Sequence, residues 1–351
     1  FDQVLRPFVG QSFVTGIEQS FADIGPMAIV ETPDGDILVS GGTSRSSLFR
    51  FGHDGGDAFN AWAELPYPIF NMAFDGEGRL WATTGGGPLL ELDPDTGNIL
   101  GEHGDGITMA LAVEPSTGLI YTASGAVWSG GVNGNYGGAG GVQVFDPVSE
   151  TFSLFSRDLN LRAASLAFDY DGNLWATTWP DRSQVVRFTP QRRGELMLEF
   201  DAPIDSLAFG QPGTDLEGLM FVSQNQGAND HPGSELTMVD LATLRRVSVA
   251  DGGTRGDVIV TTSDGRVLVS QSNQVDVLNP AVAPLIIATN PPLDGIALLP
   301  ISTITITFDQ EMFTGVGGEP NSVLNPENYM LVGDIVGDVA LTEVIYIDAT
   351  N

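Results

Sequence analysis

One stretch of this sequence occurs twice with few changes. Residues 72–84 read MAFDGEGRLWATT, and residues 166–178 read LAFDYDGNLWATT. Each copy is a short apolar run, an acidic turn containing glycine, and a second apolar run that opens on Leu-Trp. Looser copies occur along most of the chain, and self-similarity on this scale predicts a repeat architecture.

The aligned copies define six repeat units, and their first strands begin roughly 37 to 57 residues apart, a spacing close to that of four-stranded propeller blades. In each unit the first strand leads through a tight glycine turn into a second strand. The sequence therefore predicts an all-β chain with a six-bladed β-propeller over residues 1–282. The expected first residues of the inner strands are Met27, Met72, Met109, Leu166, Leu207 and Val258.

The sixth unit has no fourth strand of its own, whereas residues 13–17 near the N-terminus form a strand that belongs to no unit. We expect this N-terminal strand to complete the last blade and close the ring, because closure removes exposed sheet edges. Trp81 and Trp175, which open the second strands of their units, are expected to pack between blades.

The pattern changes from residue 283 onward. Residues 302–312 alternate between apolar and polar side chains, as in a half-buried sandwich strand. Further strands are expected at 325–331 and 344–347. The succession of P-x-x-G, ITITF and NPENY resembles the bacterial Ig-like domain of surface proteins, which implies a partial β-sandwich over residues 283–351. Since a full sandwich has about 100 residues, we expect the natural protein to continue beyond this domain.

The composition narrows the possible partners. The chain has 45 acidic residues against 14 basic ones and a net charge of −31, which would repel nucleic acid and anionic membranes. It contains no cysteine and no long apolar run, so neither a thiolate metal site nor direct membrane insertion is expected. It begins with Phe1 rather than Met, and we expect a processed protein that is secreted or held at the cell surface.

The repeat core Asp-Gly-x-Leu-Trp-Ala-Thr resembles the six-bladed propeller group that contains virginiamycin B lyase, gluconolactonase-like proteins and NHL-repeat proteins. This resemblance implies a metal-assisted His and Glu site at the channel mouth of the lyases, with Glu at the positions of Thr83 or Thr177. The sequence has no Glu-x-His pair, which departs from the lyase pattern. The resemblance to gluconolactonase-like proteins implies a cation held in the channel.

Candidate binding residues follow from the blade alignment. The loops after the second strands are long and share one face of a propeller, where binding usually occurs. The residues just before each inner strand should lie nearest the axis. Together these positions give the binding-face candidates Asn71, Thr108, Trp128, Asn135, Tyr136, Ser165, Trp179, Ser206 and His231.

Oxygen donors near the axis suggest a calcium site. Asn71, Asp205 and Asp257 offer the amide and carboxylate oxygens that Ca²⁺ prefers. Ca²⁺ is the only cofactor that the sequence suggests, and a water-filled polar channel is the alternative interpretation of the same residues.

Two functions from different classes fit these features. The favoured interpretation is a non-enzymatic binding or structural module of a large secreted or cell-surface bacterial protein, whose propeller contacts another protein, a glycan or further copies of itself. The alternative is a metal-dependent enzyme of the lyase or lactonase type at the channel mouth, with candidate residues Asn71, His103, Asp205, His231 and Asp257. Of the histidines, His103 and His231 are expected to lie apart on the decorated face, as surface residues.

Overall fold

A computed structural model of the chain describes residues 1–124, 141–156, 163–178, 182–226 and 232–280. In the C-terminal part it describes residues 286–292, 295, 300–308, 312, 314, 322–333 and 337–347. The chain separates into two compact units, Phe1–Ala281 and Val282–Asn351. Among the described residues, no helix has the length and apolar character needed to cross a membrane.

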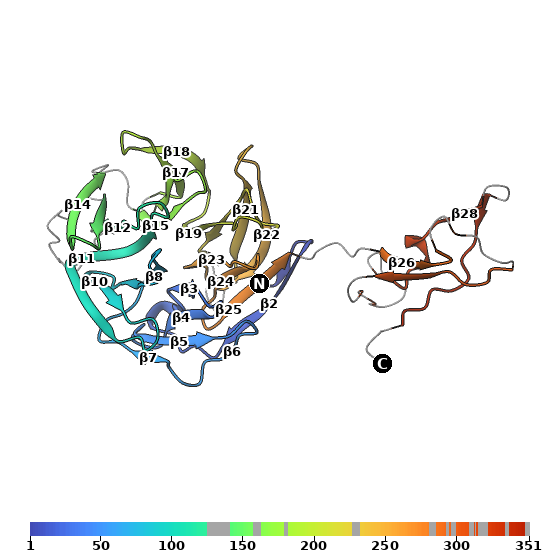
Figure 1. Cartoon of the computed structure of the whole chain (residues 1–351), viewed down its shortest axis with the longest axis horizontal. Coiled ribbons are helices and arrows are strands. Elements are labelled where there is room, and N and C mark those ends of the chain that lie inside the picture. Colours follow the sequence, from blue (N-terminus) through green and yellow to red (C-terminus); the bar gives the residue numbers. More distant parts are fainter. Residues whose placement is uncertain are drawn as a thin grey trace. The chain divides into compact units, whose positions relative to one another are not determined.

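The first unit consists of sheets arranged radially around a centre (Figure 1). The first blade has the order β3 (Ile29–Glu31), β4 (Ile37–Gly41), β5 (Ser47–Phe51), β7 (Ala63–Glu64). The second and third blades share the order β8 (Asn71–Phe74), β9 (Leu80–Thr83), β10 (Gly87–Leu92), β11 (Ile99–Val113), β12 (Ile120–Ser124), β13 (Val142–Asp146), β14 (Thr151–Ser156).

The remaining three blades follow the same plan. The fourth has the order β15 (Ala163–Phe168), β16 (Leu174–Thr178), β17 (Gln184–Phe188), β18 (Gly194–Glu199). The fifth has β19 (Ile204–Phe209), β20 (Leu219–Gln224), β21 (Ser234–Asp240), β22 (Arg246–Gly253) and, at its edge, β1 (Gln3–Val4). The sixth has β23 (Ile259–Thr261), β24 (Val267–Ser270), β25 (Val275–Pro280), β2 (Phe8–Thr15), β6 (Gly56–Asp57).

The innermost strands form a continuous ring. Each of β3, β8, β11, β15, β19 and β23 contacts the innermost strand of the next blade, including β23 against β3. The prediction of an all-β, six-bladed propeller is therefore confirmed. The N-terminal strand β2 is longer than expected and pairs antiparallel with β25, with Phe8 opposite Pro280 and Val14 opposite Val275.

One strand differs from the expected pattern. The sequence predicted an outer strand at 98–102 and a separate inner strand from Met109, whereas the structure has a single strand, β11, that joins the second and third blades. Gly104 and Gly106 adopt φ of 67° and 72° inside it. Glycine reaches this left-handed region without steric cost, so the strand bends between the two blades without ending.

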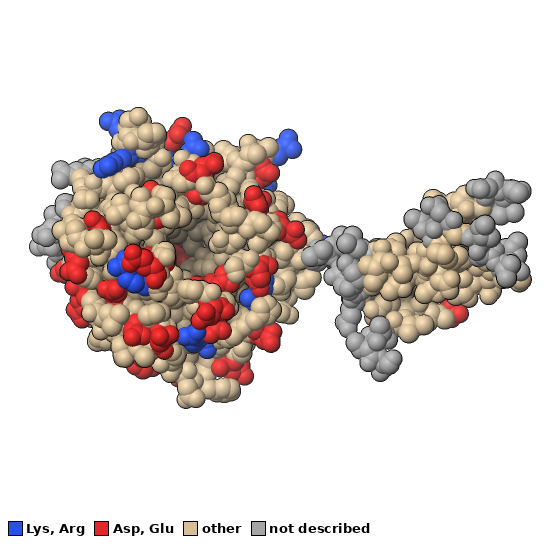
Figure 2. All heavy atoms as spheres, in the orientation of Figure 1, with Lys and Arg blue, Asp and Glu red and all other residues tan. Residues whose placement is uncertain are grey.

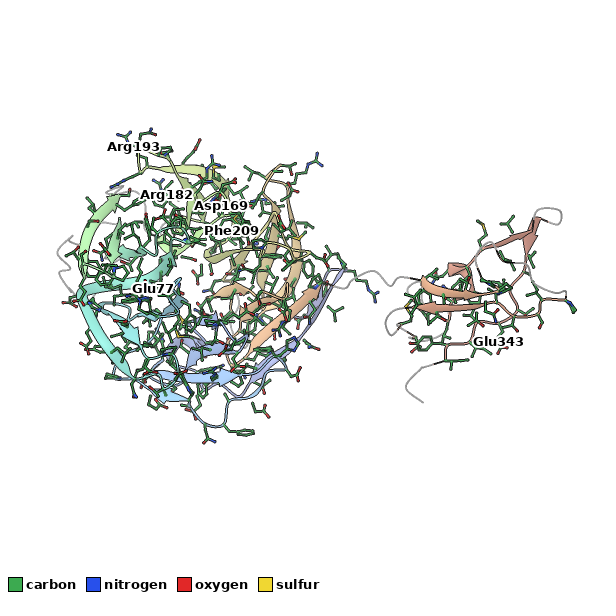
Figure 3. The ribbon with its side chains drawn as sticks, in the orientation of Figure 1. Glu77, Asp169, Arg182, Arg193, Phe209 and Glu343 are labelled. Carbon is green, nitrogen blue, oxygen red and sulfur yellow. The ribbon has the colours of Figure 1, made fainter. Side chains whose placement is uncertain are left out.

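The duplicated stretch is explained by turn chemistry. The Asp75 carboxylate accepts the N–H groups of Glu77 and Arg79 at 2.9 and 3.0 Å and the Trp81 indole N–H at 2.9 Å. In the second copy Asp169 accepts the Trp175 indole N–H at 2.7 Å. Both tryptophans are buried in hydrophobic clusters, as predicted. The turn residues Glu77 and Asp169 lie in separate blades (Figure 3).

A hydroxyl near the end of the second strand links four blades to their neighbours. Each donates to a backbone carbonyl near the beginning of the next inner strand, a bond worth about 1 kcal/mol. These bonds fix where the following inner strands begin. One of them anchors β19 at Asp205. The pairs are Ser40 to Ile69 at 3.1 Å, Thr83 to Met109 at 2.9 Å, Thr177 to Asp205 at 2.6 Å and Ser223 to Gly256 at 2.5 Å.

In the second unit, β26 (Ile286–Asn290) pairs with β27 (Thr305–Phe308), and β28 (Leu331–Gly333) pairs with β29 (Gly337–Val339). The predictions of two further strands, at residues 325–331 and 344–347, are wrong. Residues 325–331 contain the short 3-10 helix η2 (Pro326–Asn328), because proline supplies no ladder N–H and Asn325 O accepts the N–H of Asn328. Residues 344–347 are not in a strand. The Ig-like identity of this unit stays a prediction.

Candidate functional site

The centre of the propeller is hollowed on the face shown in Figure 2, where acidic side chains predominate. The innermost strands surround this channel, so residues at their first positions lie at one mouth of it. Asp205 is the second residue of β19, and Asp257 lies just before β23 in the next blade. Both predicted channel carboxyls therefore belong to the same mouth, on adjacent inner strands.

The two carboxyl groups are joined by Asn225, which follows β20 in the loop to the third strand. Its side-chain N–H group donates to Asp205 Oδ2 and, at 3.0 Å, to Asp257 Oδ1. On its other side Asp257 forms a bidentate ion pair with Arg255, whose Nε and Nη2 lie 2.9 and 2.6 Å from the two carboxylate oxygens. Such planar pairs have well-defined geometry, so the Asp257 carboxyl group is held in a fixed orientation.

Burial and then the negative charge of Asp257 raise the pKa of the Asp205 carboxyl to about 7, while the hydrogen bond from Asn225 acts in the opposite direction. Two neighbouring carboxyls thus differ in character: Asp257 is paired with a guanidinium, and Asp205 holds its proton up to neutral pH. The Asp205 residue is only partly buried. This combination is the one that proton transfer at neutral pH requires.

Arg45 lies in the loop between β4 and β5 on the first blade. Its Nε donates to Ser20 Oγ at 2.8 Å, and its guanidinium lies 4.6 Å from the ring centre of Phe21. Burial lowers the pKa of Arg45, the charge of Asp257 opposes this effect, and the charge of Arg255 adds to it. Its electrostatic environment is therefore set by the same Asp257 and Arg255 groups at the mouth.

The other predicted channel residues have structural partners. Asn71 Oδ1 accepts the N–H of Met72 at 2.8 Å, and no contact joins it to Asp205 or Asp257 in the described part of the chain. Ser165 and Ser206 are buried; the Ser165 N–H donates to Thr177 Oγ1, and the Ser206 hydroxyl accepts the N–H of Ile259. The backbone of Thr108 lies in β11. Trp128, Asn135, Tyr136, Trp179 and His231 lie outside the described residues.

His103 is only partly exposed, whereas the sequence suggested a surface residue. It lies within β11 opposite Leu89, with its ring centre 4.8 Å from that of Phe145 and 5.8 Å from that of Trp81. Its Nε2 is buried and has no hydrogen-bond partner in the described structure. Because β11 continues through this position, the side chain packs inside a blade rather than at the channel.

The oxygen donors at the mouth do not form the predicted calcium site as they are arranged. Among the described residues, no three His, Asp or Glu side chains converge as metal ligands. Asp257 is already paired with Arg255, and Asn225 presents its N–H group to both carboxyls. These groups satisfy one another and do not fit a divalent cation as arranged, so calcium at Asn71, Asp205 and Asp257 stays a prediction.

Sequence reasoning missed three residues of the cluster: Arg45, Asn225 and Arg255. Asn225 and Arg45 belong to loops after second strands, and Arg255 lies two residues before an aligned channel position. Such positions were visible in the blade alignment. No local pattern, however, marks which of several polar loop residues point toward the axis.

Comparison with known proteins supports the fold. No family model matches the sequence, and no curated protein matches it. The structure is similar to that of a candidate gluconolactonase, with 14% identity, a TM-score of 0.59 and coverage of 79% of this chain and 93% of that one. It is also similar to a candidate glucose dehydrogenase from Thermus thermophilus, with 17% identity, a TM-score of 0.58 and coverage of 78% and 100%.

A third similar structure is that of a streptogramin B lyase, with 15% identity, a TM-score of 0.50 and coverage of 79% of this chain and 99% of that one. The chain is thus a six-bladed propeller resembling lyase and gluconolactonase-like structures. The favoured interpretation as a non-enzymatic surface module is corrected by these comparisons, since the similar propellers are described as enzymes and not as surface modules. At such low identity the likeness itself shows the fold, and the function is argued from the site.

Proposed function

We propose that the protein is an enzyme whose site is the channel mouth around Asp205 and Asp257, and that it hydrolyses a small sugar-type lactone. The single observation that carries this proposal is the pair of unlike carboxyls: Asp257 paired with Arg255, and Asp205 with its pKa raised to about 7 by burial and by Asp257. The similarity to a candidate gluconolactonase supports the choice of substrate class.

The residues present at the mouth are sufficient for a simple hydrolytic sequence. Asp205 in its carboxylate form accepts a proton from a water molecule whose oxygen attacks the lactone carbonyl carbon. As the bond between this carbon and the ring oxygen breaks, the protonated Asp205 returns the proton to the ring oxygen. Lactone and water are thereby converted into a hydroxy acid, and Asp205 regains its starting state.

The neighbouring groups keep Asp205 ready for this role. Burial and the negative charge of Asp257 keep the Asp205 pKa near neutrality, and Arg255 holds the Asp257 carboxyl in place through two hydrogen bonds. The side-chain amide of Asn225 donates to both carboxyls and so fixes their positions relative to each other. The backbone carbonyl of Asp205 is anchored to the fourth blade by Thr177. Each partner therefore fixes either the charge or the position of the proton-transfer group.

The test is turnover of a panel of five- and six-membered aldonolactones, followed by proton release in weakly buffered solution. Wild type should accelerate hydrolysis of at least one lactone over the buffer rate, and Asp205→Asn should lose about 10²- to 10⁴-fold of that rate, the usual contribution of a general base. Asp201→Asn, an exposed carboxyl in the preceding turn, is the matched control and should keep full activity. Equal rates for the two variants would refute the assignment.

We also infer that β2 closes the ring. The pairing of β2 with β25 and the contact between β23 and β3 support this inference. A chain that lacks residues 1–15 should then lose the cooperative unfolding transition of the propeller, measured by tryptophan fluorescence. Retention of that transition at an unchanged urea midpoint would contradict closure by this strand.

A further inference from the structure

Several buried polar side-chain atoms have no hydrogen-bond partner within the described residues. A buried polar group without a partner is uncommon and calls for a physical explanation. His103 and Thr122 lie within β11 and β12, whereas the other three follow second strands on the first and sixth blades, which are neighbours in the ring. The full set is Arg45 Nη2, His103 Nε2, Thr122 Oγ1, Gln271 Nε2 and Ser272 Oγ.

Arg45 is the member of this set that carries a positive charge. The residue is 9% exposed, and no carboxylate lies within ion-pair distance of it among the described residues. Two aromatic rings contact its guanidinium: the exposed Phe21, at 4.6 Å from the ring centre, and Phe70, at 5.4 Å. In a chain of net charge −31, a buried guanidinium without a paired carboxylate is a site prepared for an external anion.

Residues 20–25 connect this guanidinium to the sixth blade. Ser20 Oγ accepts from Arg45 Nε, and Gly25 lies so close to Ser272 that a Cβ at this position would be 2.2 Å from Ser272 O. Gln271, the neighbour of Ser272, uses its Oε1 to accept the backbone N–H of Thr254 at 2.7 Å. The Gln271 Nε2 atom has no partner among the described residues. Thr254, to which Gln271 is hydrogen-bonded, lies three residues before Asp257.

The chemistry of the free groups defines a ligand class. Arg45 Nη2 and Gln271 Nε2 are N–H donors, and the Ser272 hydroxyl is a further donor, so the complementary ligand is rich in acceptor oxygens. The negative charge of Asp257, which acts on Arg45, and the acidity of the whole chain disfavour a dianion such as phosphate. A monoanionic carboxylate matches both the donors and the charge.

We propose that Arg45, Gln271 and Ser272 bind the carboxylate of an acidic sugar, so that the substrate of this mouth is a uronic- or aldaric-type lactone rather than a neutral one. The substrate part of this inference rests on the function proposed above. The carboxylate site itself depends only on the three unpartnered groups and on the Ser20–Gly25 connection between the two blades.

The experiment is calorimetric titration with D-glucuronate, with its neutral methyl ester and D-glucose as comparison ligands. Wild type should bind the acid at least about tenfold more tightly than the ester, as expected for one charge-assisted hydrogen-bond set. Gln271→Glu keeps an acceptor for Thr254 but replaces the free N–H donor with negative charge, so it should weaken glucuronate binding at least about tenfold. The exposed Gln3→Glu has the same charge change and should leave binding unaltered.

Arg45→Lys provides a second variant that keeps the positive charge but loses the planar donor group, and it should also weaken binding of the acid. Equal affinity of wild type for acid and ester, or unchanged binding by Gln271→Glu, would overturn the carboxylate site. Asp205→Asn separates the two proposals, since it should lose about 10²- to 10⁴-fold of the turnover rate while glucuronate still binds. Glucuronate binding without turnover of any lactone would refute the proposed function and leave the carboxylate site standing.

Discussion

Asp205 makes the propeller progressively less stable as the pH rises from about 4 to about 7. Its pKa is raised from 3.8 to about 7 in the folded protein. Between these two values the folded state holds a proton that the unfolded chain has released, so the unfolding free energy falls with increasing pH. A difference of roughly 3 pKa units corresponds to at most about 4 kcal/mol, with nearly all of it lost by pH 8.

Asp205→Asn removes this titration and keeps the shape of the side chain. Its stability relative to wild type should be near equal or lower at pH 4 and should improve by up to about 4 kcal/mol at pH 8. Urea unfolding followed by tryptophan fluorescence is the assay, because all 5 tryptophans lie in residues 1–281 and report on the propeller alone. Asp201→Asn should show no such trend. A difference between Asp205→Asn and wild type that does not change with pH would refute the reasoning.

Three further predictions follow from the contacts. Asp75→Ala should lower the unfolding free energy by about 1–3 kcal/mol in urea titrations, because it leaves the buried indole N–H of Trp81 without an acceptor; an unchanged midpoint would count against the turn account. His103→Leu should keep or raise the melting temperature, since it replaces a buried unpartnered nitrogen, whereas a large loss would reveal a partner. Calcium at about 1 mM, a concentration that fills weak protein sites, should leave the melting temperature unchanged while Arg255 occupies Asp257; a clear rise would establish the predicted metal site.

The propeller was predictable because its signals are local and repeated. The turn at Asp75 and the one at Asp169 are each determined by a few neighbouring residues, and six copies reinforce one another. The continuous strand β11 was not predicted, because glycine in the sequence indicates a turn and only the pairing of both neighbours shows a bend instead. The segment around Pro326 was also predicted wrongly, because it forms a turn of 3-10 helix where a strand was expected.

The site was predictable only in part. Asp205 and Asp257 could be placed near the axis, since strand register alone puts residues at the beginning of inner strands there. Their partners Asn225 and Arg255 come from different loops, and whether an acid meets a metal, an amide or a guanidinium depends on three-dimensional contacts between blades. For this reason the sequence suggested a cation at a place where the structure has a guanidinium.

The central claim is that a carboxyl at the channel mouth exchanges its proton near neutral pH. The direct measurement is a ¹³C NMR titration of protein labelled at the aspartate carboxyl carbons, compared with the same titration of Asp205→Asn. The account predicts one aspartate resonance with an apparent pKa of about 7 that is missing from the variant. If every aspartate carboxyl of the wild-type protein titrates below about pH 5, as unperturbed groups do, the acid–base role of Asp205 is contradicted.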